Sequence, residues 1–230
     1  MHQIDIRPEI VERVVKRRGR VRLFERLDPA RTAAVYIDMQ ITFLAPGAPV
    51  EVPMARAIVP QINGLNAQLR ALGVPIYWVA HANTSRHGAS DWPGFFDHFV
   101  SDDARERTIA GLAPGADGQQ LWPELEVADD DTVLFKNRYS ALIAGSSSLE
   151  TMVRGRSIDT LLIGGTKTDV CCESTARDAM MLDFKTVMLA DCCAALSDEE
   201  HRNALETIIQ QFGDVMTADE VVAALESTTA

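Results

Sequence analysis

The sequence is poor in cysteine and in positive charge. Its four cysteines form two adjacent pairs, Cys171 with Cys172 and Cys192 with Cys193. Neighbouring cysteines are poorly placed to bridge each other, and no CxxC zinc pattern is present, so neither a disulfide framework nor a structural zinc site is expected. The formal net charge is −11. Such a charge argues against nucleic acid or an anionic membrane as the main partner, because both would be repelled.

Long apolar runs are also missing. No run approaches the roughly 20 apolar residues of a membrane-spanning helix. The first residues, MHQIDIRPEIVERVVKRRGR, are too charged for the apolar core of a signal peptide. We therefore expect a cytoplasmic protein that acts on a small molecule, with neither a nucleic acid nor a membrane as its partner.

Short apolar segments rich in β-branched residues alternate with segments of helical period. This alternation is typical of a parallel sheet with crossover helices. Strands are expected at residues 33–37, 75–80, 132–135, 160–163, 186–190 and 214–217. Helices are expected at residues 8–16, 54–72, 197–212 and 218–225. We predict a single α/β domain over residues 1–230, with a doubly wound, mainly parallel six-stranded sheet and helices on both faces.

Two segments lie outside this alternating pattern. Residues 1–31 form an N-terminal arm that includes a basic helix. Residues 82–131 are irregular, with glycines, prolines and several aromatic residues. Because an unstructured connection of that length is unusual in a compact domain, we expect it to contain short helices and to cover a site. Its aromatic residues fit local core packing and substrate contact equally well.

Reactive side chains follow three of the expected strands. In a doubly wound sheet, ligands bind beyond the carboxyl ends of the strands. Asp38 follows AAVYI, Lys136 follows TVLF, and Cys171 comes a short turn after TLLIGG. Taken singly, such residues are more often a helix cap, a solvated lysine and a small core residue. The occurrence of all three residues at the same edge of one sheet, however, predicts a reactive site.

These three groups fit the chemistry of amide cleavage. A cysteine at the start of a helix is expected to be stabilised as a thiolate by the helix dipole, and a nearby ammonium would lower its pKa further. Asp38 could take the thiol proton and pass it to the leaving amine, while Lys136 holds carboxylate and thiolate in place. Unpaired N–H groups at the helix start could receive the oxyanion.

Four segments make the sequence resemble the isochorismatase-like cysteine hydrolases, a family that includes nicotinamidases, N-carbamoylsarcosine amidases and ureidoacrylate amidohydrolases. They are AAVYIDMQITFLAPG, VLFKNRYSAL, GGTKTDVCCESTARDAMMLDF and VMLADCCAALSDEEHRNAL. The resemblance implies the catalytic triad Asp38, Lys136 and Cys171. It also implies a cis peptide bond between Thr166 and Lys167, so that the N–H groups of Lys167 and Cys171 together form the oxyanion hole.

The same resemblance suggests three substrate contacts. The RYSAL stretch is similar to an element of ureidoacrylate amidohydrolases whose tyrosine lies near the substrate, which makes Tyr139 a candidate. His81 stands where those enzymes carry an amide side chain, and Asn83 is its neighbour. A hydrogen-bonded scaffold role for His81 is the alternative to substrate contact.

The resemblance also bears on cofactors. Nicotinamidases of this family bind a metal through an Asp-x-His element, and no such element follows the second expected strand. We therefore expect neither a metal nor another cofactor. Isochorismatases of the siderophore type act on a vinyl ether and lack the nucleophilic cysteine, so Cys171 favours cleavage of a C–N bond.

The leading hypothesis is a cysteine-dependent amidohydrolase that forms a thioester with a small linear amide, ureido or carbamoyl compound and releases ammonia or an amine. Ureidoacrylate-like and N-carbamoyl substrates come first. The alternatives are a nicotinamidase-like or other small-amide hydrolase, a thiol-redox protein that uses the vicinal cysteines, and a non-catalytic assembly protein. Cys172, Cys192 and Cys193 are interpreted as core residues, and relatives suggest a homodimer or homotetramer.

Overall fold

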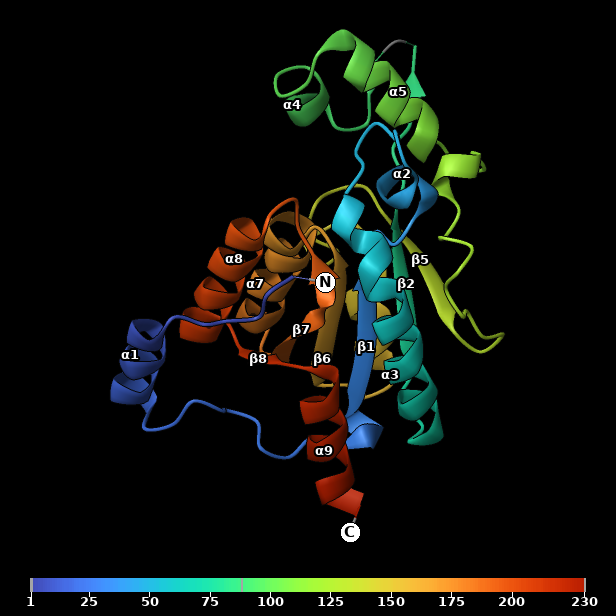
Figure 1. The fold of residues 1–230 in the computed structure, drawn as a ribbon. Helices are drawn as coiled ribbons and strands as arrows, with labels where there is room; N and C mark the ends of the chain where they lie inside the picture. The colour runs from blue at the N-terminus through green and yellow to red at the C-terminus, as the bar shows by residue number, and fades with distance from the viewer. Residues whose placement is uncertain (1, 88, 230) are drawn as a thin grey trace.

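A six-stranded parallel sheet forms the centre of the molecule (Figure 1). The computed structural model describes residues 2–87 and 89–229. Within that part of the chain, the main sheet has the order β5-β2-β1-β6-β7-β8, and every neighbouring pair is parallel. Its strands are β1 (Thr32–Ile37), β2 (Ile76–His81), β5 (Thr132–Lys136), β6 (Thr160–Thr166), β7 (Lys185–Ala194) and β8 (Asp214–Met216). The predicted doubly wound α/β fold is confirmed.

Helices cover both faces of this sheet. The structure places α3 (Val59–Ala71) and α9 (Ala218–Thr229) on one face, and α6 (Leu149–Gly155), α7 (Glu173–Met181) and α8 (Asp198–Gln211) on the other. Alternate residues of β1 therefore enter different cores: Tyr36 packs under α3, whereas Val35 packs under the second group of helices. Every residue of β1 is buried, as expected for a parallel strand covered on both faces.

For the helix predicted over residues 54–72, the predicted starting residue is wrong. The chain first forms a 3₁₀ turn, η2 (Pro53–Ile58), and α3 begins only at Val59. Pro60 explains the break, because it has no N–H to donate to the carbonyl of Arg56 and its ring would clash with that carbonyl in a continuous helix. The N–H of Val59 bonds to the Arg56 carbonyl instead.

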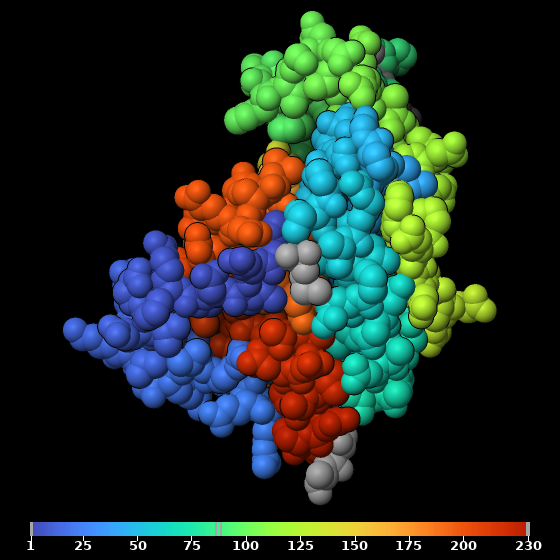
Figure 2. Space-filling view, viewed as in Figure 1, coloured from blue at the N-terminus to red at the C-terminus, as the bar shows by residue number. Residues whose placement is uncertain are grey.

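The N-terminal arm lies along the C-terminal part of the chain. Its helix α1 (Pro8–Arg18) packs beside α8, and Figure 2 shows the blue arm against the orange and red surface. The guanidinium of Arg7 donates to the carboxylate of Glu206, and Arg18 pairs with Asp214 at 3.2 Å. These ion pairs fix the arm on the face that α8 covers.

The segment over residues 82–131 contains short elements of its own. They are β3 (Ser85–Arg86), β4 (Ala89–Ser90), α4 (Pro93–Phe96), α5 (Asp102–Leu112) and the 3₁₀ turn η3 (Asp117–Gln119). Figure 1 shows α4 and α5 beyond the carboxyl ends of the central strands, beside α2 (Ile41–Leu44). Across the described residues, no helix is both long and apolar enough to cross a membrane.

Candidate active site

The three side chains predicted to react meet at the carboxyl edge of the sheet. Asp38 follows β1, Lys136 ends β5, and Cys171 lies in the π-helical turn η4 (Thr168–Cys172) after β6. The ammonium of Lys136 is 2.9 Å from Oδ2 of Asp38. A carboxylate oxygen of Asp38 and Sγ of Cys171 lie within 4.8 Å of each other. All three residues are buried.

Unusual backbone geometry positions Asp38. Its φ of 56° is left-handed, a conformation that costs a residue with a side chain about 1–3 kcal/mol and needs support from the surrounding fold. Its N–H donates to the carbonyl of Val79 on β2. On the other side, Gly165 of β6 has a φ of 109°, and a Cβ there would lie 2.1 Å from the carbonyl oxygen of Ile37. Only glycine allows β6 to pass this close to the residue before Asp38.

Three acceptors surround the ammonium of Lys136. Its Nζ lies 2.9 Å from Oδ2 of Asp38, 3.0 Å from Nδ1 of His81 and 3.0 Å from the carbonyl oxygen of Arg138. An ammonium has three N–H donors and no acceptor. Nδ1 of His81 must therefore accept, so a neutral imidazole carries its proton on Nε2.

The Asp38–Lys136 pair is held in its charged form. Burial by itself would raise the pKa of Asp38, but the charge of Lys136 and the contact with His81 lower it below the usual value. Burial would likewise lower the pKa of Lys136, and the charge of Asp38 raises it instead. His81 differs, because burial and the charge of Lys136 both lower its pKa. The resting site thus contains a carboxylate, an ammonium and a neutral imidazole.

The sequence-based expectation of a stabilised thiolate is wrong. Burial raises the pKa of Cys171 well above its usual value, and the charge of Asp38 raises it further. Lys136 acts in the opposite direction but does not offset these two effects. The expectation counted the helix start and the ammonium, and it left out burial and the carboxylate. Cys171 is therefore a thiol at rest, placed where it can donate to Asp38.

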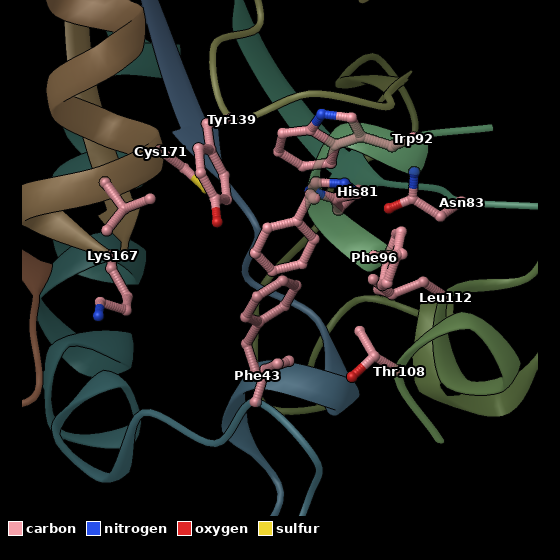
Figure 3. A pocket seen from close by; sticks show the side chains of 13 residues that line it. Phe43, His81, Asn83, Trp92, Phe96, Thr108, Leu112, Tyr139, Lys167 and Cys171 are labelled. Carbon is pink, nitrogen blue, oxygen red and sulfur yellow. The ribbon is translucent and has the colours of Figure 1, made fainter. Parts of the chain in front are cut away.

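A cavity of about 200 Å³ opens beside Cys171 (Figure 3). All three predicted substrate contacts, Tyr139, His81 and Asn83, line it. Its aromatic wall also includes Phe43, Trp92, Phe95 and Phe96. The last three come from the irregular segment, whose aromatic residues the sequence assigned equally to local core and to substrate contact. In the structure they pack on one another and also face the cavity.

Two buried polar atoms on this cavity lack partners. Among the described residues, neither Nε2 of His81 nor Oδ1 of Asn83 makes a hydrogen bond of good geometry, although the Asn83 side chain lies close enough to His81 to oppose the lowering of its pKa. The amide nitrogen of Asn83 donates to Oδ1 of Asp91 at 2.9 Å, which leaves its oxygen as the free end. Buried polar atoms are rarely left unsatisfied, so both are candidates for ligand contact.

Asp38, His81 and Cys171 are also of the types that bind metals, with ligand atoms within 4.8 Å of one another. The ammonium of Lys136, however, lies within 3.0 Å of both Asp38 and His81. A positive charge already occupies the place between these ligands, and a divalent cation there would be repelled. These residues do not fit a bound metal ion.

Gln40 is a site residue that the sequence analysis did not single out. Its side-chain oxygen accepts from the N–H of His81 at 2.6 Å, and its amide nitrogen donates to the carbonyl oxygens of His81 and Gln119. Gln40 therefore fixes the end of β2, where His81 lies. The signal was present in the DMQ triplet, two positions after Asp38.

The remaining sequence-based candidates lie as follows. The peptide bond between Thr166 and Lys167 is cis. The side chain of Lys167 borders the cavity, with its amine 3.8 Å from Oδ2 of Asp169.

The other three cysteines, Cys172, Cys192 and Cys193, are free thiols in the two apolar cores, and each is at most 1% exposed. Their interpretation as core residues is confirmed.

The strand order defines a doubly wound α/β protein, and the polar cluster at the carboxyl edge of its sheet is a candidate ligand site. The chain belongs to the isochorismatase family, since the isochorismatase domain model matches residues 32–220.

Two curated proteins are similar along most of their length. Ureidoacrylate amidohydrolase RutB of Methylobacterium radiotolerans is 30% identical, over 87% of this chain and 80% of the relative. The isochorismatase family protein YecD of Escherichia coli O157:H7 is 30% identical, over 86% of this chain and 98% of the relative. Among solved structures, a cysteine hydrolase from Pseudomonas syringae pv. phaseolicola has a TM-score of 0.76 at 28% identity, over 87% of this chain and 95% of that one.

Proposed function

We propose that this protein is a cysteine-dependent amidohydrolase that cleaves the C–N bond of a small linear amide through a thioester on Cys171. The observation that carries the proposal is the buried ion pair between Asp38 and Lys136, set beside the thiol of Cys171 at the wall of a cavity. A thiol that faces a carboxylate has a base within reach, as nucleophilic catalysis requires.

In the first step, the carboxylate of Asp38 takes the proton of the Cys171 thiol as sulfur attacks the amide carbonyl carbon. Because burial and Asp38 itself raise the pKa of this thiol, the proton transfer accompanies the attack and does not precede it. The ammonium of Lys136 holds the carboxylate in place and offsets the negative charge that moves onto sulfur. It needs no proton transfer of its own, and its raised pKa keeps it charged.

The tetrahedral intermediate carries an oxyanion. We assign its stabilisation to the backbone N–H groups of Lys167 and Cys171, which come from the turn between β6 and α7. When the intermediate collapses, the C–N bond breaks and the carboxyl proton of Asp38 moves to the leaving nitrogen. Ammonia or an amine departs, and the acyl group stays on sulfur.

Water completes the cycle. Asp38, again a carboxylate, takes a proton from a water molecule, whose oxygen attacks the thioester carbonyl. The C–S bond breaks, the proton returns to sulfur, and the carboxylic acid product leaves. This sequence uses each member of the cluster and leaves every group in its starting protonation state.

The ureidoacrylate relative supports ureido and carbamoyl compounds as the first substrates to screen. An assembly into a homodimer or homotetramer and a cytoplasmic location stay predictions from the sequence. The thiol-redox alternative is less well supported, because all four cysteines are buried.

An ammonia-release screen tests the proposal. Ureido, carbamoyl, nicotinamide and simple aliphatic and aromatic amides are supplied in turn to the wild-type enzyme, to Cys171→Ala and to Cys172→Ala. Turnover that is lost in Cys171→Ala and kept in Cys172→Ala supports the proposal, whereas equal turnover in wild type and Cys171→Ala would refute it.

A further inference from the structure

A buried side chain of α8 holds the turn η4, which carries Cys171. Oγ1 of Thr168, the first residue of this turn, lies 2.9 Å from Nδ1 of His201 on α8. Both residues are fully buried, and α8 packs against the turn. A hydroxyl can donate or accept, so this hydrogen bond forms with either tautomer of the imidazole. The bond joins the turn to a helix whose described residues do not line the cavity.

The position of Thr168 in the chain matters for the proposed chemistry. It directly follows Lys167 and precedes Cys171 by three residues, so it lies between the two N–H groups that we assign to the oxyanion. Two donors stabilise an oxyanion only if both are directed at the place where its charge develops. A displacement of about 1 Å can lower a rate about 100-fold. A contact that fixes Thr168 therefore fixes both donors.

A second imidazole, from the N-terminal arm, covers His201. The rings of His2 and His201 stack with centroids 4.6 Å apart and an angle of 17° between their planes. The side chain of His2 is only 1% exposed, although the arm lies on the surface of the molecule (Figure 2). Figure 1 shows the arm running past α8 toward the centre of the molecule. The stacked ring limits the rotation of His201 and so favours the orientation that bonds to Thr168.

Both nitrogens of His2 are held in turn. Nδ1 lies 2.6 Å from Oδ1 of Asp198 at the start of α8, and Nε2 accepts from the N–H of Ala195 at 3.0 Å. An ionised carboxylate only accepts, so the neutral ring carries its proton on Nδ1. The same contact with His2 lowers the pKa of Asp198. A continuous chain of contacts thus runs from the arm through His2 and His201 to Thr168.

The arm that supplies His2 lies outside the matched isochorismatase domain, which covers residues 32–220. Besides its ion pairs with the rest of the chain, the arm is fixed by the buried carboxylate of Asp214. That carboxylate accepts from the N–H groups of Leu23 and Phe24 at 2.6 and 2.9 Å. The contact with His201 is therefore made by a well-anchored segment that is additional to the family domain.

We propose that His201 is a positioning residue for the turn that carries the oxyanion donors, and that the N-terminal arm contributes to catalysis by holding His201 through His2. This inference rests on the proposed function and adds to it two residues that do not line the cavity. Both act on the reaction only through Thr168. Because the oxyanion is absent from the bound substrate, loss of this chain of contacts lowers kcat and leaves KM nearly unchanged.

Two threonine variants test the contact with the turn. Thr168→Val removes the hydroxyl and keeps the shape of the side chain, whereas Thr168→Ser keeps the hydroxyl. With the best amide from the ammonia-release screen, Thr168→Val should lower kcat at least about tenfold at a nearly unchanged KM, and Thr168→Ser should stay within about threefold of wild type. Thr207→Val is the matched control and should leave kcat unchanged, because the Thr207 hydroxyl donates to the carbonyl of Asn203 within α8. Equal kcat in Thr168→Val and wild type would overturn the proposal.

A double-mutant cycle tests the role of the arm. His2→Ala should lower kcat about threefold or more in the wild-type background, and by less than about twofold in the Thr168→Val background, because the hydroxyl through which it acts is then missing. Arg13→Ala removes an arm contact with Gln210 near the end of α8 and should leave kcat unchanged. Thermal melting shows which variants are folded at the assay temperature. If Thr168→Val does not fold, His201→Phe replaces it in the cycle, since phenylalanine keeps the stacked ring and lacks the bonding nitrogen.

The outcomes separate this inference from the proposed function. If the effects of His2→Ala and Thr168→Val on kcat simply multiply, His2 has a structural role only and the assignment to the arm is overturned. Turnover that is lost in Cys171→Ala but unaffected by His2→Ala and Thr168→Val would overturn this inference and leave the thioester mechanism standing. If the wild-type enzyme releases no ammonia from any amide, both proposals are overturned.

Discussion

The carboxylate of Asp38 and the ammonium of Lys136 are 2.9 Å apart although a whole strand, β2, lies between the strands that carry them. His81, the last residue of β2, stands in this gap and accepts from the same ammonium at 3.0 Å. The site is therefore built on three neighbouring strand ends, and Cys171 joins it from the turn after a fourth strand.

Replacing Lys136 by methionine should leave a buried carboxylate without its partner. Breaking a buried ion pair in this way costs about 3–5 kcal/mol of stability at neutral pH. We expect urea unfolding to show that loss, and kcat/KM to fall at least about 100-fold because Asp38 no longer serves as a base. Lys185→Met is the matched control, since that lysine is half exposed and 3.7 Å from its partner Asp159. Equal effects of the two substitutions would contradict the role given to Lys136.

The protonation state of Cys171 can be observed directly. Since burial and Asp38 raise its pKa, the resting enzyme should show no thiolate absorbance from Cys171 between acidic pH and about pH 8.5, the usual pKa of a free cysteine. The measurement is the ultraviolet difference between wild type and Cys171→Ala as pH rises, with Cys172→Ala as the reference variant. A thiolate signal below neutral pH would show instead a thiolate stabilised by Lys136 and the helix start.

His201 should make stability fall in mildly acidic solution. It hydrogen-bonds to Thr168 in the turn that carries Cys171, and its ring stacks on His2. Burial, together with the charge of His2, lowers the pKa of His201 from 6.5 to about 4. The unfolded chain therefore binds more protons between these pH values, so the free energy of unfolding decreases as pH falls through this window, by at most roughly 3 kcal/mol.

The test is chemical denaturation of His201→Gln and of wild type at several pH values from 7 to 4. The substitution should flatten the decrease relative to wild type, because a neutral amide does not take up the proton. His98→Gln, at an exposed position between α4 and α5, serves as the control. An unchanged slope in His201→Gln would contradict the assignment.

Replacement by alanine at two glycines, Gly165 and Gly64, should change the stability of the fold in opposite directions. At Gly165, the new Cβ would lie 2.1 Å from the carbonyl oxygen of Ile37, and the φ of 109° strains any side chain. We expect a loss of about 3 kcal/mol or more, together with lower activity, because β1 would move and carry Asp38 with it. Gly64 lies exposed within α3 with nothing near its Cβ position. Gly64→Ala should therefore raise stability by about 0.5–1 kcal/mol.

Thermal melting of both variants separates these expectations. If Gly165→Ala were as stable as wild type, the close passage of β6 beside Asp38 would not constrain the site.

The sequence predicts the strand ends well because two physical regularities apply there. Buried parallel strands appear in the sequence as short apolar runs, and their carboxyl ends meet at one edge of the sheet, so the sequence alone places Asp38, Lys136 and Cys171 together. Such apolar runs do not indicate the order of the strands in the sheet. The bridging contact of His81 with Lys136 depends on that order, and only the structure shows it.

Three other features could not be predicted from the sequence, each for a different reason. The raised pKa of Cys171 depends on the depth of burial and on the side of the thiol that faces Asp38, which residue spacing does not report. The start of α3 was missed because the apolar pattern continues across Pro60, although the hydrogen bonding does not. The aromatic wall could not be assigned because Trp92 and its neighbours pack on one another and line the cavity at the same time.

The most direct test of the account is the identity of the residue that carries the acyl group. The enzyme is quenched with acid during turnover of the best amide from the ammonia-release screen, and its peptides are mapped by mass spectrometry. The account predicts the acyl mass on the peptide that contains Cys171, lost on treatment with hydroxylamine and absent from Cys171→Ala. An acyl group on another residue, or turnover that persists in Cys171→Ala, would contradict it.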